Sequence, residues 1–143
     1  MKPGMHVGGA MPFEMSWYLP KRVVLLRYYG HATVEDIDRV GDVSVQYVLE
    51  GTPPVHIIAD MTEVETFPTN LRQSARAIRT IKDPAMGWTV IISTNPLMRV
   101  IIVTLSRLAG FRFHIATSRE QARAFLVGVD ATLKELLDAD LLT

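Results

Sequence analysis

The segment from Val55 to Leu71 constrains the fold of this chain more than any other part of it. A short apolar run from Val55 to Ala59 ends at Asp60, a polar connector follows, and Pro68-Thr69-Asn70 opens an amphipathic stretch. In an α/β protein this order is typical of a buried parallel strand, the loop at its carboxyl end and the start of the next helix. Ligand and partner sites of open α/β sheets gather at the carboxyl ends of the strands, so we expect the functional site near this segment.

The rest of the chain alternates between strand patterns and helix patterns. Strands separated by helices of this length imply right-handed crossovers and a largely parallel sheet, with the first strand antiparallel at an edge. We therefore predict one α/β domain over residues 13–143, with a mixed, mostly parallel five-stranded sheet in the order β-β-α-β-α-β-α-β-α, after a flexible amino terminus at 1–12. Strands are expected over 13–19, 22–29, 55–60, 88–93 and 111–116, and helices over 33–50, 68–83, 95–108 and 117–126, with one more short helix within 130–142.

Composition excludes several classes of protein. The chain has 143 residues, enough for one real core. Fifteen basic and fifteen acidic residues give no net charge, so we expect no nucleic-acid partner. Cysteine is absent, which removes disulfides, thiolate metal sites and cysteine nucleophiles. No apolar run approaches the roughly 20 residues that span a bilayer, and the first residues lack the layout of a signal peptide, so we expect a cytoplasmic protein.

The element order and two sequence stretches resemble the STAS domain, which is shared by bacterial anti-sigma-factor antagonists and the cytoplasmic tails of sulfate transporters. The first stretch is Ile57-Ile58-Ala59-Asp60-Met61-Thr62-Glu63-Val64, and the second is Thr117 to Ala122 followed by Phe125-Leu126. More closely, residues 13–127 are similar to the small stand-alone bacterial proteins called SpoIIAA-like. The resemblance implies a non-enzymatic regulatory or protein-interaction module.

The same resemblance indicates where a regulatory site would lie. Anti-sigma-factor antagonists carry an Asp and a regulatory phosphoserine at the start of the helix after this strand. Those positions fall on Pro68 and Thr69 here, and the glycine that follows is replaced by Asn70. Thr69 has a second interpretation as an ordinary helix N-cap. Asp60 likewise either binds a metal or a partner, or stabilises its loop by accepting backbone N–H bonds, which is the favoured interpretation.

A row of arginines follows on the next helix. Spacings of four and three residues place Arg72, Arg76 and Arg79 on one helix face, near a helix amino end where an anion could sit. In the STAS resemblance this helix is part of the partner-binding surface, whereas the alternative is a solvated helix face. The candidate partner-binding or regulatory residues are therefore Asp60, Thr62, Thr69, Asn70, Arg72, Arg76 and Arg79.

The helix over 97–108 is apolar around well over half of its circumference, more than packing on one sheet face requires. A homodimer interface is the first interpretation, because cyclic dimers are the commonest oligomers. The alternative is a small apolar-ligand, lipid-like binding protein that uses a cleft near the 61–70 loop and this helix. The residues expected to form the dimer or ligand surface are Met98, Ile101, Ile102 and Leu105.

Catalytic signals are missing from the sequence. It holds no Ser/His/Asp, paired-carboxylate or phosphate-cradling glycine pattern, so we expect no enzyme, cofactor or metal. His56 and His114 lie within strand patterns and are interpreted as structural histidines.

Overall fold

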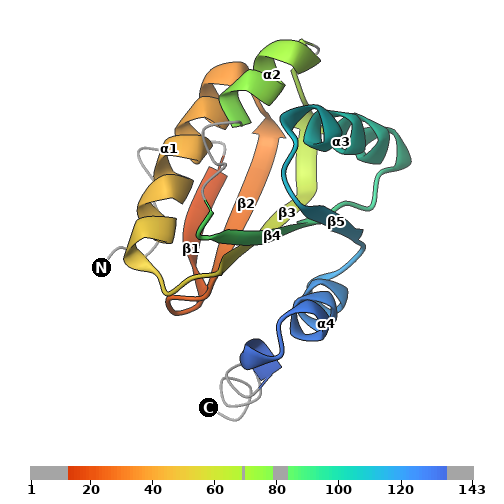
Figure 1. Cartoon of the computed structure of the whole chain (residues 1–143). Helices are drawn as coiled ribbons and strands as arrows, with labels where there is room; N and C mark the ends of the chain where they lie inside the picture. Colours follow the sequence, from red (N-terminus) through yellow and green to blue (C-terminus); the bar gives the residue numbers. More distant parts are fainter. Residues whose placement is uncertain (1–12, 69, 79–83, 135–143) are drawn as a thin grey trace.

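The computed structural model describes residues 13–68, 70–78 and 84–134, and the predicted order of elements is confirmed within them. Figure 1 shows strands and helices following one another along the chain as the sequence patterns indicate. The strands are β1 (Phe13–Leu19), β2 (Val23–His31), β3 (Val55–Thr66), β4 (Met86–Ile92) and β5 (Phe113–Ala116), and the helices are α1 (Val34–Glu50), α2 (Leu71–Ile78), α3 (Pro96–Ala109) and α4 (Arg119–Val129).

The five strands form one mixed sheet in the order β1-β2-β3-β4-β5. Strand β1 pairs antiparallel with β2 at one edge, and every other neighbouring pair is parallel, as predicted. The register places one apolar row straight across the sheet, in which each residue is paired with the next: Met15, Leu26, Ala59, Ile91 and Ile115.

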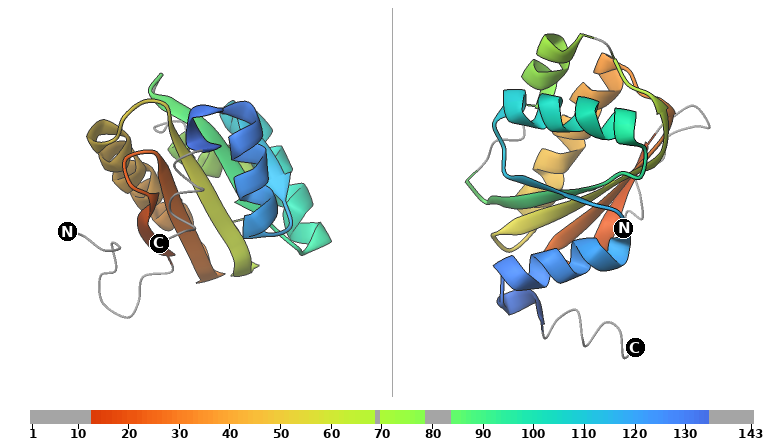
Figure 2. Two further views of the ribbon diagram at one scale, coloured as in Figure 1. Left: turned by 90° about the horizontal axis from the view of Figure 1, so that it is seen from below. Right: turned by 90° about the vertical axis from the view of Figure 1, so that its right-hand side faces the viewer.

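Helices α1, α2 and α3 lie over one face of the sheet, and α4 lies under the other (Figure 2). This arrangement follows from the strand order. Each of the three crossovers joins a strand to its parallel neighbour in the same direction, and right-handed crossovers of that kind place their helices on one face. Helix α4 follows β5, and within the described residues no further strand comes after it. We call the face under α1, α2 and α3 the upper face, and the face against α4 the lower face.

Side chains alternate between the two faces along each strand and build a core on both. Leu26, Ala59 and Ile91 belong to the upper core with α1 and α3. Their neighbours Ile58 and Val90 belong to the lower core, where Ala122 and Leu126 of α4 cover them. Because the central strands are buried on both faces, they appear in the sequence as continuous apolar runs.

The helix ends use the capping residues that the sequence indicates. The Thr33 hydroxyl accepts from the backbone N–H of Asp36, and the Asp36 carboxylate accepts from that of Thr33, which makes a capping box. Asn95 caps α3, whose first residue is Pro96, and Ser118 caps α4. Gly110 ends α3 with φ 79°, a left-handed conformation that glycine adopts without steric cost.

The largest difference from the predicted elements is in β3, which continues to Thr66 instead of ending at Asp60. The residues expected to form a loop at 61–66 pair with the end of β2, where Gly30 is opposite Val64. Met61 and Val64 are buried, but register shifts in the β2–β3 ladder interrupt the strict alternation that would have marked a strand.

Three further expectations fall wholly or partly outside the described residues. These are the segment 1–12, the end of the predicted helix at 79–83, and most of the expected helix within 130–142. Of the last, residues 132–134 are helical.

Candidate interaction site

Helix α2 carries two of the three arginines that the sequence singled out, Arg72 and Arg76, and a local cap determines where it begins. The Asn70 side-chain oxygen accepts from the backbone N–H of Gln73 at 3.0 Å, so Asn70 occupies the N-cap position. One of the two interpretations of the sequence gave that position to Thr69; the cap is the next residue, Asn70. Thr69 itself and Arg79 lie outside the described residues.

Arg72 and Arg76 are exposed on α2 and border a surface hollow whose other lining residues are Ala75 and Leu108. Ala75 is buried against α3, where it forms a small apolar cluster with Leu105 and Ala109. Neither arginine makes an ion pair or hydrogen bond within the part of the chain that the structure describes. We call this site the α2–α3 hollow: an apolar floor with two free guanidinium groups at its rim.

The outer side of α3 exposes apolar side chains, but they are not the residues that the sequence predicted for a dimer or ligand surface. Met98, Ile102 and Leu105 are buried, and Ile101 is only partly exposed. The exposed residues are instead Leu97, Val100 and Leu108, which we call the α3 outer stripe, with exposed fractions of 72%, 63% and 50%. The stripe through 98, 102, 105 and 109 packs inward, which turns 97, 100 and 108 outward at helical spacing.

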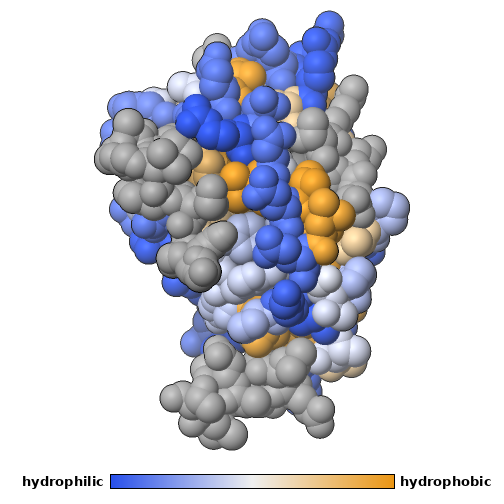
Figure 3. Space-filling view, turned by 90° about the vertical axis from the view of Figure 1, so that its left-hand side faces the viewer, coloured by the Kyte–Doolittle hydropathy of each residue, from blue (hydrophilic) through white to orange (hydrophobic). Residues whose placement is uncertain are grey.

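The side of the molecule that carries α1 has a different character. Figure 3 shows hydrophilic side chains running along this side, with hydrophobic residues only in separate patches. Glu35, Asp38 and Asp42 are exposed on α1. Scattered apolar residues of this kind are usual on a protein surface and need no partner.

Asp60 and Thr62 form a cluster of their own. One carboxylate oxygen of Asp60 accepts from the Thr62 backbone N–H at 3.0 Å and from its hydroxyl at 2.6 Å, and the other lies 3.3 Å from the Arg119 guanidinium. Burial raises the pKa of the Asp60 carboxyl, but the hydrogen bonds from Thr62 and the contact with Arg119 outweigh burial and hold that pKa below its ordinary value. Asp60 and Thr62 thus join β3 to the start of α4, whereas Arg72 and Arg76 lie in the helix layer over the opposite face.

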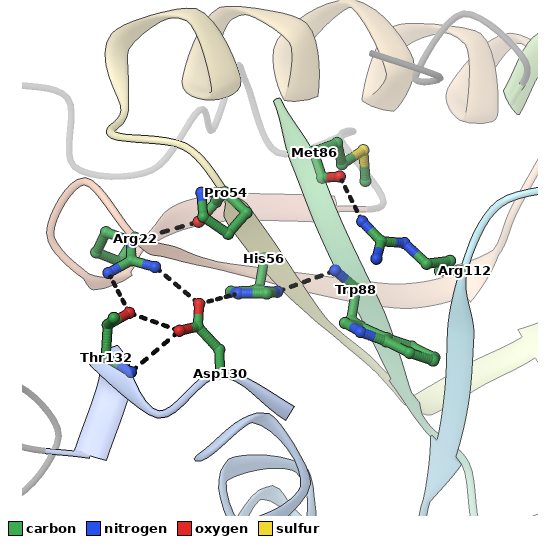
Figure 4. A network of polar contacts seen from close by, with 8 residues as sticks. All are labelled: Arg22, Pro54, His56, Met86, Trp88, Arg112, Asp130 and Thr132. Carbon is green, nitrogen blue, oxygen red and sulfur yellow. Dashed lines mark hydrogen bonds and ion pairs between the residues drawn. The ribbon is translucent and has the colours of Figure 1, made fainter. Parts of the chain in front are cut away.

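A second polar network fastens the end of α4 to the sheet (Figure 4). His56 is 2% exposed; its Nε2 lies 2.9 Å from Asp130 Oδ2, and its Nδ1 accepts the Trp88 backbone N–H at 2.9 Å. The Arg22 guanidinium contacts the same Asp130 oxygen at 2.8 Å, and Thr132 donates to the other. The interpretation of His56 as a structural histidine is confirmed.

The geometry also fixes the protonation state of His56. Because Nδ1 accepts a hydrogen bond, the ring proton is on Nε2, and the imidazole is neutral. Burial lowers the pKa of His56 and outweighs the opposing effect of Asp130. Burial alone would raise the pKa of Asp130. Hydrogen bonds from Thr132 and His56 and the charge of Arg22 outweigh burial and lower this pKa to about 2.

Neither a metal site nor a membrane span is found within the described residues. No group of three or more His, Asp or Glu side chains there is placed to hold a metal ion. None of the described helices is long and apolar enough to cross a membrane.

No protein-family model matches the sequence, and no curated protein matches it either. Solved structures do match. An uncharacterised protein of the DUF3478 family with a SpoIIAA-like fold, from Shewanella loihica, superimposes with a TM-score of 0.57 and 15% identity, over 80% of this chain and 91% of that one. This chain has a SpoIIAA-like fold. Two structures of SiaC from Pseudomonas aeruginosa also match, with TM-scores of 0.51 and 0.50 and identities of 10% and 14%, each over 80% of this chain and 98% of theirs.

This SpoIIAA-like fold also contains a cavity of about 90 Å³ under the helix layer. Its lining includes Ile102 and Leu105 of α3, and Met61 and Phe67 from the region expected to form a ligand cleft.

Proposed function

We propose that this domain is a non-enzymatic, cytoplasmic regulatory module that binds an acidic segment of a partner protein in the α2–α3 hollow. The observation that carries the proposal is the pair of exposed arginines, Arg72 and Arg76, beside the apolar floor formed by Ala75 and Leu108. Free guanidinium groups form strong, often bidentate hydrogen bonds with carboxylates. An amphipathic segment with acidic and apolar side chains would satisfy both parts of the hollow.

The position of the hollow supports this assignment over a solvated helix face. It lies beside the α3 outer stripe: Leu108 lines the hollow, and Leu97 and Val100 are exposed further along α3, beyond the exposed Thr104. The α2 helix also follows the residue that corresponds to the regulatory hydroxyl of anti-sigma-factor antagonists, Thr69. Phosphorylation there would add negative charge three residues before Arg72 in the sequence, in competition with an acidic partner.

Photo-crosslinking in cells tests the proposal. A photoreactive amino acid at position 108 should form an adduct with a partner protein that mass spectrometry can identify. The double variant Arg72→Glu, Arg76→Glu should lose about nine-tenths of the adduct, because charge reversal opposes an acidic ligand. Lys134→Glu, an exposed charge reversal beyond α4, is the matched control and should keep it. If the protein with both arginines, the double arginine variant and the Lys134→Glu control all gave the same adduct yield, the role of the arginines would be contradicted.

We further propose that two copies associate through the α3 outer stripe when no partner segment occupies the hollow, because Leu108 belongs to both surfaces. Three large apolar side chains at least half exposed on one helix are more than scattered surface residues, and an isologous contact would cover the stripe of both copies. This interface uses none of the four residues expected from the sequence, Met98, Ile101, Ile102 and Leu105.

A second candidate function is the binding of a small apolar ligand, and the internal cavity supports it. The cavity lies where the sequence indicated, between the end of β3 and α3. Its volume is below the roughly 150 Å³ of a cavity that binds benzene, so it fits a small molecule better than the acyl chain of a lipid.

A further inference from the structure

The two edges of the sheet differ in how they are protected. Strand β1 forms one edge, where a register shift follows Trp17 and the Met15 carbonyl already accepts a hydrogen bond from the Tyr47 hydroxyl at 3.2 Å. Strand β5 forms the other edge. Its four residues, Phe113–Ala116, include no proline or lysine, and no bulge interrupts its ladder with β4. Proline, lysine and bulges usually prevent an edge strand from pairing with another chain, so the edge of β5 lacks these protections.

The backbone of β5 directs hydrogen-bonding groups away from the sheet. The carbonyls of Arg112 and Ala116 each accept a backbone N–H of β4 at 3.0 Å. Because successive residues of a strand turn their N–H and C=O to alternate sides, those of Phe113 and Ile115 point away from β4. These groups form no hydrogen bond within the described residues. Figure 2 (right) views the domain from this side, with α3 above β5 and α4 below it.

The side chains of β5 are compatible with pairing. Phe113 and Ile115 are partly buried and pack against the upper core. His114 is exposed on the lower face, where its ring stacks on Phe125 with the centroids 3.8 Å apart. No Asp, Glu, Lys or Arg occurs in the strand, so a second copy of it would meet no fixed like charge.

We propose that β5 pairs antiparallel with β5 of a second copy, about a two-fold axis that is perpendicular to the sheet beside His114. The sheets of the two copies then join into one. This inference rests on the dimer proposed above through the α3 outer stripe, and adds the sheet edge to its interface.

The spacing of the outward-facing residues makes this edge complementary to itself. In antiparallel pairing centred on His114, Phe113 is opposite Ile115 of the second copy, and Ile115 is opposite Phe113 of the second copy. Both members of each pair turn their backbone groups outward, so each of the two pairs exchanges two hydrogen bonds. Each pair also sets an aromatic side chain beside a β-branched one, a favourable cross-strand combination.

The same axis brings the two α3 outer stripes to one side. Because the axis is perpendicular to the sheet, the upper helices of both copies lie over the same face of the joined sheet. Helix α3 leads directly into β5 through residues 110–112, which places it next to the axis. Backbone hydrogen bonds alone add little to association, because water competes for the same groups. An isolated extended peptide would leave the stripe exposed, whereas a second copy covers it.

Cysteine crosslinking tests the pairing, and the absence of native cysteine makes each introduced thiol unique. At the axis His114 faces His114 of the second copy in a non-hydrogen-bonded pair, with Cα atoms about 4.5 Å apart. That separation lies within the range of roughly 4.4–6.8 Å that a disulfide spans, so His114→Cys should form a disulfide-linked dimer under mild oxidation. In the control Arg112→Cys, the two thiols would be four residues apart along the strands, about 13 Å, and should crosslink at least tenfold more slowly.

A proline variant tests whether the backbone groups hold the dimer. Ile115→Pro removes an N–H that points outward, so it costs no hydrogen bond within the sheet but blocks pairing. Its circular dichroism spectrum should match the wild type, while sedimentation shows at least tenfold weaker dimerisation. Ile115→Val keeps both the N–H and the β-branched shape, and should dimerise like the wild type. If Ile115→Pro fails to fold, the two cysteine variants decide.

Three outcomes would overturn the proposal. Equal crosslinking rates of His114→Cys and Arg112→Cys would refute the register. A dimer that Val100→Glu dissociates and Ile115→Pro leaves intact would refute pairing through β5 but leave the α3 interface standing. A wild type that sediments as a monomer would refute both interfaces together.

Discussion

The Nε2 atom of His56 lies 2.9 Å from Asp130 Oδ2, although the two residues are 74 positions apart in the sequence. This contact joins the amino-terminal half of β3 to the residue that ends α4. The same imidazole accepts the backbone N–H of Trp88, so one buried side chain connects β3, β4 and α4.

Replacing His56 by alanine should destabilise the domain by about 2–4 kcal/mol, because the Trp88 N–H and the Asp130 carboxylate would both lose a buried partner. Urea unfolding followed by circular dichroism measures the change. His31→Ala is the control: His31 is exposed and should cost less than about 0.5 kcal/mol. A His56 variant as stable as the control would show that the network contributes nothing to stability.

Stability should fall as the pH is lowered below about 6.5, the ordinary pKa of histidine. The lowered pKa of His56 means that the folded protein binds fewer protons than the unfolded chain in this range, so acidification favours unfolding. The lowered pKa of Asp130 acts in the same direction, between its ordinary value of 3.8 and about 2. Glutamine at position 56 can accept from Trp88 and donate to Asp130 without titrating. His56→Gln should therefore flatten the dependence between pH 7 and 5; an unchanged slope would assign it to other groups.

Two glycines should respond to alanine in opposite ways. A Cβ on Gly87 would overlap the ring of His56, and strain there should destabilise the fold by about 1–3 kcal/mol. Gly128 lies inside α4, and a Cβ there would have no neighbour within 4 Å among the described residues outside the adjacent helix backbone. Gly128→Ala should stabilise the helix by about 0.5–1 kcal/mol, since alanine loses less backbone freedom. Thermal unfolding of the two variants measures both effects, and a change of the same sign in both would refute the close-contact argument.

Glutamate at two neighbouring positions of α3 should separate a subunit contact from the core. Ile102→Glu places a charge among buried residues and should unfold the protein. Val100→Glu lies on the α3 outer stripe and should leave the circular dichroism spectrum unchanged, while sedimentation shows a dimer becoming a monomer. A wild type that already sediments as a monomer would remove the proposed interface.

Much of the fold could be predicted because local signals determine its element boundaries. Thr33, Asn95 and Ser118 are capping residues that sit just before apolar helical patterns, and each is used. The apolar runs of β3 and β4 indicated strands buried on both faces. The order of these elements then restricts the topology, because crossovers are right-handed.

The orientation of α3 could not be predicted for a physical reason. A helix that is apolar around most of its circumference has no polar face to oppose the core, so its rotation depends on contacts with the sheet and with α2. Met98 and Leu97 are equally apolar in the sequence, yet one is buried and the other exposed. The ion-pair partner of Asp60 could not be predicted either, because Arg119 is 59 residues away in the sequence.

Placing α4 after every strand has a consequence for synthesis. The ribosome releases the chain from its amino end, so the sheet and its three upper helices can assemble before α4 exists. During that interval the lower-face side chains of Ile58, Val90 and Ile92 face water. From Ala116 to Leu133 the delay is about 1–3 s at typical elongation rates. Helix α4 therefore completes a nascent domain whose apolar underside is open to chaperones or to aggregation until the helix arrives.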